Sequence, residues 1–110
     1  MTYKMFLDDI RNPSWVCPDL GSDTEWVICR TMGQAITAIQ EGGWPSLISF
    51  DHDLGNDEPS GMEFARWLVE LDLDTGGMPK DFSYKVHSAN PVGAVNIHLL
   101  MRGYLQHRSD

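Results

Sequence analysis

Hydrophobic positions along the chain follow two alternating patterns, one typical of strands and one typical of helices. Short apolar or alternating runs predict four strands, at residues 3–7, 26–31, 47–50 and 82–86. Apolar residues at helical spacing predict three helices, at residues 32–40, 61–71 and 92–106. Strands that alternate with helices in this way predict an α/β domain, with parallel strands joined by right-handed crossovers and helices on the faces of the sheet.

The helix starts also have the expected polar residues. Thr31 and Ser60 stand directly before two of the helical segments, and Asn90 followed by Pro91 stands before the third. These residues are typical N-caps, and proline is favoured at the first position of a helix. The segment at residues 14–24 has neither pattern and contains Pro18, so we expect a loop there with at most one helical turn.

Length and composition favour a single folded domain spanning residues 1–110, with 42% hydrophobic and 22% charged residues. No apolar run approaches the ~20 residues that a membrane span needs. Acidic residues follow Leu7 at once, so the N-terminus does not resemble a signal peptide and we expect a cytoplasmic protein. Cys17 and Cys29 form no CxxC pair, which favours two reduced, partly buried thiols.

The formal net charge of −8 bears on the partners of the protein. A surface of this sign does not retain long nucleic acid, because such binding depends on many Lys and Arg contacts with phosphates. A small phosphate ester or a single RNA end stays compatible with it, held through a metal or a few local cations. No membrane partner is expected, and the sequence predicts nothing about the oligomeric state.

Polar clusters follow three of the four predicted strands, at residues 8–9, 51–53 and 87–90. In a parallel sheet all strands end at the same edge, and ligands of open α/β sheets bind there. The three clusters are therefore expected to meet in space. Carboxylates and imidazoles crowded at this edge would repel one another or shift their pKa values unless a cation or a phosphate ligand compensates them.

The residue types indicate a metal-assisted phosphoester site. Carboxylate oxygens are ligands that Mg²⁺ or Mn²⁺ prefers, and imidazoles can transfer protons. The predicted metal ligands are Asp8, Asp9 and Asp51, with Asp53 as a further one. The predicted proton-transfer residues are His52 and His87. The predicted phosphate-binding residues are Arg11, Ser88, Asn90 and Asn96, with Gly93 leaving room for a ligand near the start of the last helix.

Each of these residues also has an ordinary structural interpretation. The acids can be turn residues, His87 can satisfy a backbone carbonyl, and Asn90 is fully explained as a helix cap. Trp15 is either a core residue or a flank of the pocket. Arg30 either faces the ligand or has a structural role, and His98 is expected to be structural or exposed.

Three motifs, LDDIRNP at residues 7–13, SFDHDLG at 49–55 and VHSANPVG at 86–93, together resemble the cyclic-phosphate processing receiver-like domain family. This family is a divergent relative of the receiver domains of two-component signalling. The resemblance implies a reduced receiver-like (flavodoxin-like) three-layer sandwich with a mostly parallel sheet of about four strands. It also implies the processing of cyclic phosphates, with the 2′,3′-cyclic ends of damaged RNA, and hence RNA repair, favoured.

The comparison with receivers can be made residue by residue. Asp8 and Asp9 match the paired acids after the first receiver strand, and Asp51 matches the phospho-accepting aspartate. Residues 88–89 match the hydroxyl–alanine pair. The fifth strand with its lysine–proline pair is missing, since Lys85 is the last lysine, and the first receiver helix is replaced by the loop around residue 18.

The sequence thus predicts a metal-dependent phosphoesterase that acts on a cyclic phosphate. Asp51 is either a metal ligand or the nucleophile that forms an aspartyl-phosphate. The competing hypothesis is a non-catalytic, degenerate receiver domain that binds a nucleotide or a protein partner. A conventional phosphoacceptor of a phosphorelay is a third hypothesis, which the missing lysine disfavours.

Overall fold

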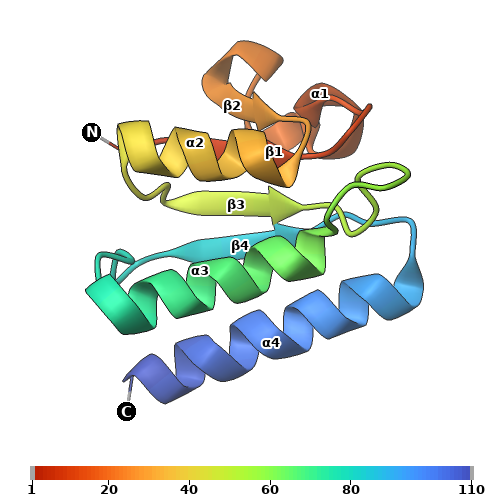
Figure 1. Cartoon of the computed structure of the whole chain (residues 1–110). Coiled ribbons are helices and arrows are strands. Elements are labelled where there is room, and N and C mark those ends of the chain that lie inside the picture. The colour runs from red at the N-terminus through yellow and green to blue at the C-terminus, as the bar shows by residue number, and fades with distance from the viewer. Residues whose placement is uncertain (1, 110) are drawn as a thin grey trace.

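A four-stranded, all-parallel sheet lies at the centre of the computed structural model, which describes residues 2–109 (Figure 1). Its strands are β1 (Lys4–Leu7), β2 (Trp26–Cys29), β3 (Leu47–Phe50) and β4 (Ser83–Val86). They are arranged in the order β2-β1-β3-β4. This is the first part of the 2-1-3-4-5 order of flavodoxin-like folds, so the predicted receiver-like α/β fold is confirmed.

The four strands end in register. Leu7 lies opposite Cys29 on one side and opposite Phe50 on the other, and Phe50 lies opposite Val86. Because the strands are parallel and level, the residues that follow them emerge at one edge of the sheet. Residues 8, 51 and 87 are these next residues on β1, β3 and β4.

Three helices cover one face of the sheet, namely α2 (Met32–Gly42), α3 (Gly61–Thr75) and α4 (Pro91–Ser109) (Figure 1). Alternate strand residues point to this face, where they form the main core with apolar residues of the helices. The buried side chains of this core include Met5, Leu7, Ile48, Phe50, Ala35, Ile39, Phe64, Leu68, Ile97 and Met101.

The opposite face is covered over β1, β2 and part of β3, where Leu47 packs against the second core and Ser49 is fully buried. The segment at residues 8–25 contains one short helix, α1 (Pro13–Val16), and two 3₁₀ turns, η1 (Pro18–Leu20) and η2 (Asp23–Glu25). Its apolar residues pack on Phe6 and Trp26 as a second, smaller core. The segment is therefore an irregular connection, as predicted, but it has more helical structure than the single turn expected. On β4 the same face is exposed at Ser83 and Lys85.

Local boundaries differ from the predicted ones for identifiable reasons. Helix α3 continues to Thr75 and ends at Gly76, whose φ of 72° is the backbone conformation that glycine adopts most easily. The predicted caps are present. The side chain of Thr31 accepts the backbone N–H of Gln34, and that of Ser60 accepts the backbone N–H of Glu63.

Two other expectations can be compared with the structure. Cys17 and Cys29 are both free, as predicted, and both are buried where partial burial was expected. Within residues 2–109, no helix combines the length and the apolar character that crossing a membrane requires. The predicted domain runs from residue 1 to residue 110, and these two end residues lie outside the described part.

Helix α3 begins in tight contact with the chain that leaves β3. The backbone N–H of Gly61 donates to the carbonyl oxygen of His52 at 2.7 Å. A Cβ atom on Gly61 would lie 1.9 Å from the carbonyl oxygen of Asp51. The helix can therefore approach the functional edge of the sheet only because this residue has no side chain.

We expect Gly61→Ala to lower the free energy of unfolding by about 1–3 kcal/mol, because overpacking forces the backbone apart. Gly103→Ala in α4 is the matched control, since a Cβ there meets open space. The control should raise stability by up to ~1 kcal/mol through helix propensity. Urea unfolding of both variants tests this prediction, and equal effects of the two substitutions would contradict it.

Candidate functional site

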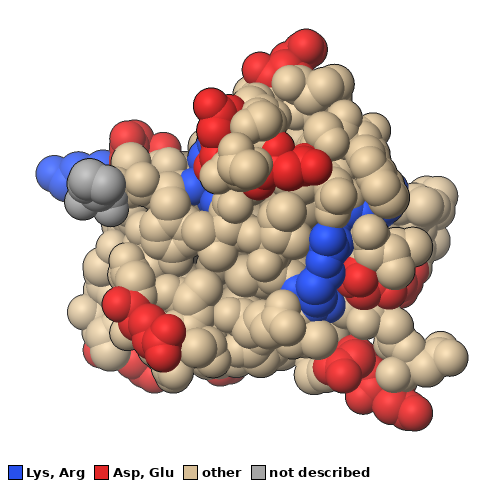
Figure 2. Space-filling model, turned by 90° about the horizontal axis from the view of Figure 1, so that it is seen from above, with Lys and Arg blue, Asp and Glu red and all other residues tan. Residues whose placement is uncertain are grey.

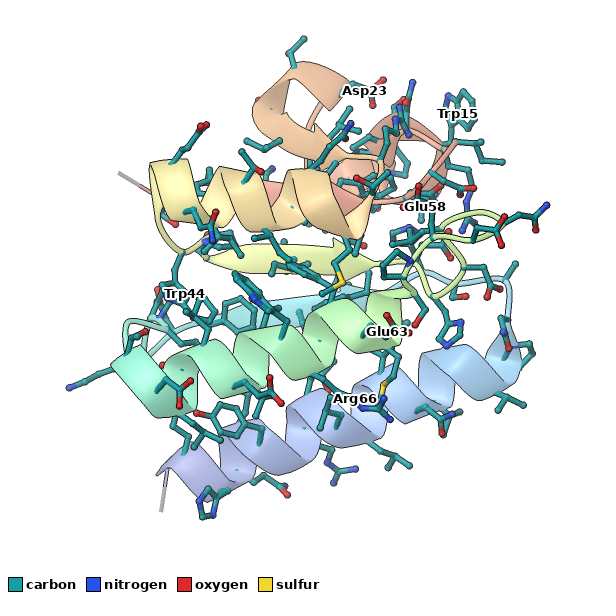
Figure 3. All side chains as sticks on the ribbon, viewed as in Figure 1. Trp15, Asp23, Trp44, Glu58, Glu63 and Arg66 are labelled. Carbon is teal, nitrogen blue, oxygen red and sulfur yellow. The ribbon has the colours of Figure 1, made fainter. Side chains whose placement is uncertain are left out.

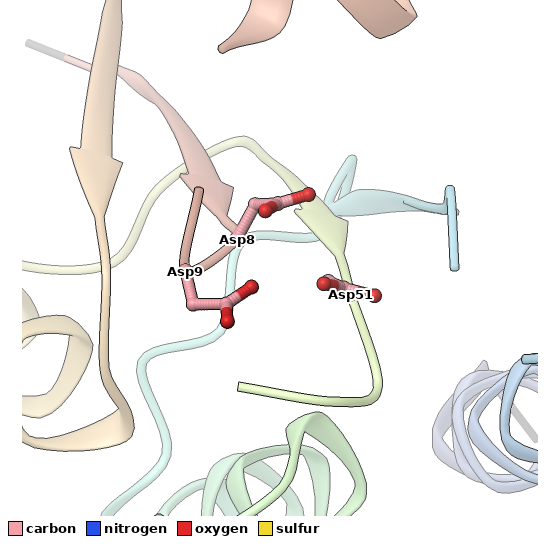
Figure 4. A group of neighbouring side chains, drawn as sticks. All are labelled: Asp8, Asp9 and Asp51. Atoms are coloured by element: carbon pink, nitrogen blue, oxygen red, sulfur yellow. The ribbon is translucent and has the colours of Figure 1, made fainter. Parts of the chain in front are cut away.

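Three carboxylates converge at the edge where the strands end (Figure 4). Asp8 and Asp9 leave β1, and Asp51 leaves β3. One carboxylate oxygen of each lies within 4.8 Å of the others. Asp8 is fully buried and Asp51 is 6% exposed, whereas Asp9 is partly buried. The structure therefore brings together the three acids that the sequence analysis selected as metal ligands.

Backbone hydrogen bonds hold the functional residues in place. The N–H of Asp8 donates to Cys29 at 3.1 Å, and the N–H of Asp51 donates to Leu7 at 2.9 Å. The N–H of His87 donates to Phe50 at 2.9 Å. Each bond continues the sheet ladder by one residue, so these side chains start from positions as rigid as the strands themselves.

The carboxylate of Asp8 is surrounded by hydrogen-bond donors. Its Oδ1 accepts the backbone N–H groups of Ile10 at 2.9 Å and Arg11 at 2.8 Å. Its Oδ2 accepts Nε of Arg11 at 2.8 Å and Nε2 of His87 at 3.0 Å. Burial alone would raise the pKa of Asp8, but these bonds outweigh burial and hold the pKa below its ordinary value.

Asp51 is compensated less completely. Burial, and next the negative charge of Asp8, raise its pKa above the ordinary value, against opposing contributions from Arg11, Ser88 and the backbone N–H of His52. The Arg11 guanidinium lies 3.5 Å from Oδ1 of Asp51, which is longer than a good charged hydrogen bond. The electrostatics at Asp51 therefore favour the approach of a further cation or of a proton.

Two arginines lie at this edge, and both have protein partners. Arg11 pairs with Asp8 and Asp51 instead of presenting a free fork to solvent, and its side chain is 29% exposed. Arg30 donates through Nη1 to the carbonyl oxygens of Asp8 and Arg11, at 3.1 and 2.6 Å, and through Nη2 to Asn12. Of the two interpretations considered for Arg30, the geometry supports the structural one.

His87 is enclosed by the protein. Its ring stacks on Phe6, with the ring centroids 4.5 Å apart and the planes 4° apart, and its side chain is 4% exposed. Its Nδ1 lies 2.7 Å from Oγ of Ser49, and its Nε2 bonds to Asp8. Proton transfer by His87 to a substrate would require one of these two bonds to open.

The protonation of His87 follows from its surroundings. Burial lowers the pKa of His87, although the neighbouring Asp8 opposes this effect. A neutral ring next to a carboxylate carries its proton on Nε2, so the Ser49 hydroxyl donates to Nδ1. Ser49 was not selected from the sequence, because its role depends on its lying on the same sheet face as His87 across the strand pair.

His52 and Asp53 form a second, more exposed pair. Nδ1 of His52 lies 2.9 Å from Oδ1 of Asp53, which is 67% exposed. Asn90 donates from Nδ2 to Oδ2 of Asp53 at 3.3 Å and accepts the N–H of Gly93 at Oδ1, which confirms its role as the helix cap. The hydrogen bond from His52, first, and the one from Asn90 hold the pKa of Asp53 below its ordinary value. The structure places Asp53 outside the group formed by the three other acids.

The space expected for a ligand at Gly93 is filled by the protein itself. A Cβ atom on Gly93 would lie 2.3 Å from Cγ of the His52 ring. The glycine therefore serves the packing of His52 against the start of α4. This contact fixes one side of the His52 ring at the rim of the site.

The remaining predicted residues differ in whether they contact the three acids. Ser88 bonds to Asp51 and accepts the N–H of Asn90 at 3.0 Å. Asn96 is exposed in the second turn of α4, and its side chain forms no hydrogen bond within residues 2–109. Trp15 is 65% exposed and points outward from α1 (Figure 3). His98 is exposed and bonds to the hydroxyl of Tyr84, as a structural residue would.

Acidic side chains outnumber basic ones on the surface (Figure 2). On the face shown in Figure 2, acidic side chains form several separate groups and basic side chains cover little area. This distribution agrees with the formal net charge of −8. Long-range attraction of phosphates is therefore weak, and any anion must be held by local groups.

Comparison with known proteins adds a family and a fold. A model of the family described as "Cyclic-phosphate processing Receiver domain" matches residues 3–103. A solved fusion protein that carries a trimeric coiled-coil segment of yeast Spc42 is similar in fold, with a TM-score of 0.52 and 15% sequence identity. The alignment covers 98% of this chain and 84% of that chain, and at this identity it shows the fold alone. A search of curated proteins finds no match.

We expect Ser49→Ala to lower the free energy of unfolding by about 1–3 kcal/mol, because Nδ1 of the buried His87 loses its donor. Ser83→Ala is the matched control, since Ser83 is exposed on the neighbouring strand. Urea unfolding gives the stabilities, and ¹⁵N shifts of the imidazole report the tautomer. A charged His87 ring at neutral pH, or a stability equal to that of the control, would contradict the assignment.

Proposed function

The chain belongs to the cyclic-phosphate processing Receiver domain family, and from this membership we propose that it is a metal-dependent phosphoesterase that opens a cyclic phosphate. The favoured substrate is the 2′,3′-cyclic phosphate end of an RNA or a nucleotide. The observation that carries the proposal is the convergence of Asp8, Asp9 and Asp51, with one oxygen of each within 4.8 Å of the others.

The three acids fit a divalent cation of the Mg²⁺ or Mn²⁺ type. All three offer hard oxygen donors, and the two buried ones, Asp8 and Asp51, share a single guanidinium, that of Arg11. Burial, and next the charge of Asp8, raise the pKa of Asp51, and Arg11 offsets these effects only in part. A bound divalent cation supplies positive charge to phosphoryl oxygens and makes water a stronger acid.

Other residues of the chain would hold the phosphate and move the proton. Arg11 carries the guanidinium nearest to the acids, and Ser88 places its hydroxyl beside Asp51. His52 is the better placed of the two histidines for proton transfer. Its Nδ1 is oriented by Asp53, while its Nε2 forms no hydrogen bond within residues 2–109. His87 then positions Asp8, since both of its ring nitrogens are already bonded.

Asp51 has two alternative roles in this proposal. It is either a ligand of the cation or the nucleophile that attacks phosphorus, and its position at the end of β3 suits both. In the nucleophile variant the Asp51–phosphorus bond forms as the bond from phosphorus to one ribose oxygen breaks. His52 then donates a proton to the departing oxygen, and water later hydrolyses the aspartyl-phosphate.

The competing function is that of a non-catalytic binding module. The observation in its favour is that the guanidinium of Arg11, which contacts the carboxylates, is already paired with Asp8 and Asp51. A domain of this kind would bind a nucleotide or a protein partner without turnover. A conventional phosphoacceptor function would instead require labelling of Asp51 by a small phosphodonor.

We expect wild-type protein to hydrolyse a 2′,3′-cyclic nucleotide with Mg²⁺ or Mn²⁺ and to lose this activity with chelator. Asp51→Asn should abolish turnover in either role of Asp51. His52→Gln should lower kcat by about 10²-fold or more, because general acid–base catalysis contributes this much. Steady-state hydrolysis of the nucleotide, and of an RNA with a cyclic end, tests these expectations.

Asp57→Asn is the control, because Asp57 lies in the same loop with a φ of 65°, a conformation that asparagine also accepts. It should leave turnover unchanged. Full activity of Asp51→Asn would exclude both roles of Asp51. Saturable binding without turnover under every metal would replace the enzyme by the binding module.

A further inference from the structure

The hydrogen-bonding capacity of the Asp8 carboxylate is fully used by the protein. An ionised carboxylate offers about four lone-pair positions. Oδ1 accepts two backbone N–H groups, from Ile10 and Arg11, and Oδ2 accepts Nε of Arg11 and Nε2 of His87. A divalent cation can therefore bind to Asp8 directly only if one of these donors leaves.

The four donors differ in how easily they can leave. The two backbone N–H groups belong to the turn that follows β1, and the His87 ring is held between Ser49 and Phe6. The Arg11 side chain is the partly exposed donor among the four, and its second contact, with Asp51, is 3.5 Å long. Arg11 is thus the donor that can be displaced at least cost.

The backbone that carries Arg11 is held independently of its side chain. Nη1 of Arg30 donates to the carbonyl oxygens of Arg11 and Asp8, and Nη2 of Arg30 donates to Oδ1 of Asn12. These bonds remain when the Arg11 guanidinium moves. A swing of this side chain therefore leaves Asp8 and the turn in place.

We propose that Arg11 is an exchangeable counter-ion that couples the binding of a divalent cation to the binding of a phosphate. In the resting protein its guanidinium neutralises Asp8 and Asp51. A cation that takes over these acids releases Arg11, and the released guanidinium then binds the phosphate group of the substrate as a bidentate fork. This inference rests on the metal site proposed above and assigns the coupling between its two ligands.

Two consequences follow from this exchange. The cation binds less tightly than three carboxylates alone would allow, because it must displace an internal positive charge. A phosphate anion makes cation binding tighter, since it gives the displaced guanidinium a new partner, and the coupling is reciprocal.

The test is a calorimetric titration of Mn²⁺ into wild type, Arg11→Met and Arg11→Gln, each with and without inorganic phosphate. Without phosphate, both variants should bind Mn²⁺ about tenfold more tightly than wild type, because a charged hydrogen bond no longer has to be broken. Phosphate should tighten Mn²⁺ binding several-fold in wild type and not in the variants. The Gln variant keeps a donor for Asp8 and guards against unfolding of the Met variant.

Lys85→Met is the charge control, since it removes one positive charge from an exposed position on β4. It should change the Mn²⁺ affinity by less than about twofold, as expected for a screened surface charge. A direct readout is the NMR signal of the Arg11 Nε–H, which should shift when diamagnetic Mg²⁺ is added to wild type.

The outcomes separate this inference from the proposed function. Mn²⁺ binding that is unchanged or weaker in both Arg11 variants would overturn the exchange and leave the metal site standing. An effect of Lys85→Met as large as that of Arg11→Met would also overturn it, because net charge alone would then explain the change. No Mn²⁺ binding by any of the proteins would overturn the metal site and the exchange together.

Discussion

The burial of two carboxylates at the end of the sheet is the constraint on which the rest of the site depends. Asp8 and Asp51 follow neighbouring strands that end level, so the parallel register forces their like charges together. Leaving either charge without partners in this environment would cost several kcal/mol, at about the scale known for buried ions. Backbone N–H groups, Arg11, His87 and Ser88 are arranged around the acids to offset this cost.

The compensation is uneven, and the proposed function gives this difference a meaning. The protein satisfies Asp8 so well that its pKa falls, whereas the pKa of Asp51 rises. One acid is therefore a fixed negative charge at the centre of the site. The negative charge of the other acid, Asp51, is only partly compensated, and a divalent cation can supply the missing positive charge. Under the proposed function, the site gives up some folding stability in exchange for affinity toward the cation.

The site lies on a sheet of four strands whose second face is only partly covered. Segment 8–25 covers the second face of the sheet at β1 and β2, where it packs on Phe6, the ring that supports His87. The same face of β4 stays open, with exposed polar residues instead of an apolar stripe. The sequence of β4 is thus suited to an edge strand with one face in solvent. The His87 ring, which follows β4, is supported by its stacking on Phe6 of β1.

Much of the fold was predictable from local patterns. Hydrophobic periodicity and the polar residues at the helix starts act over three to seven residues, so they identified the strands, the helices and the caps at Thr31, Ser60 and Asn90. The convergence of Asp8, Asp9 and Asp51 also followed, because it requires only that parallel strands end at one edge.

The tertiary structure alone decided which partners these residues have. The bond between Ser49 and His87, the His52 ring packed on Gly93, and the pairing of Arg11 with two acids all join distant segments. Such contacts depend on strand register, on the side of the sheet to which a side chain points, and on its rotamer. Local spacing carries none of this information, because the same residues at the same intervals could meet other partners if a strand shifted by one residue.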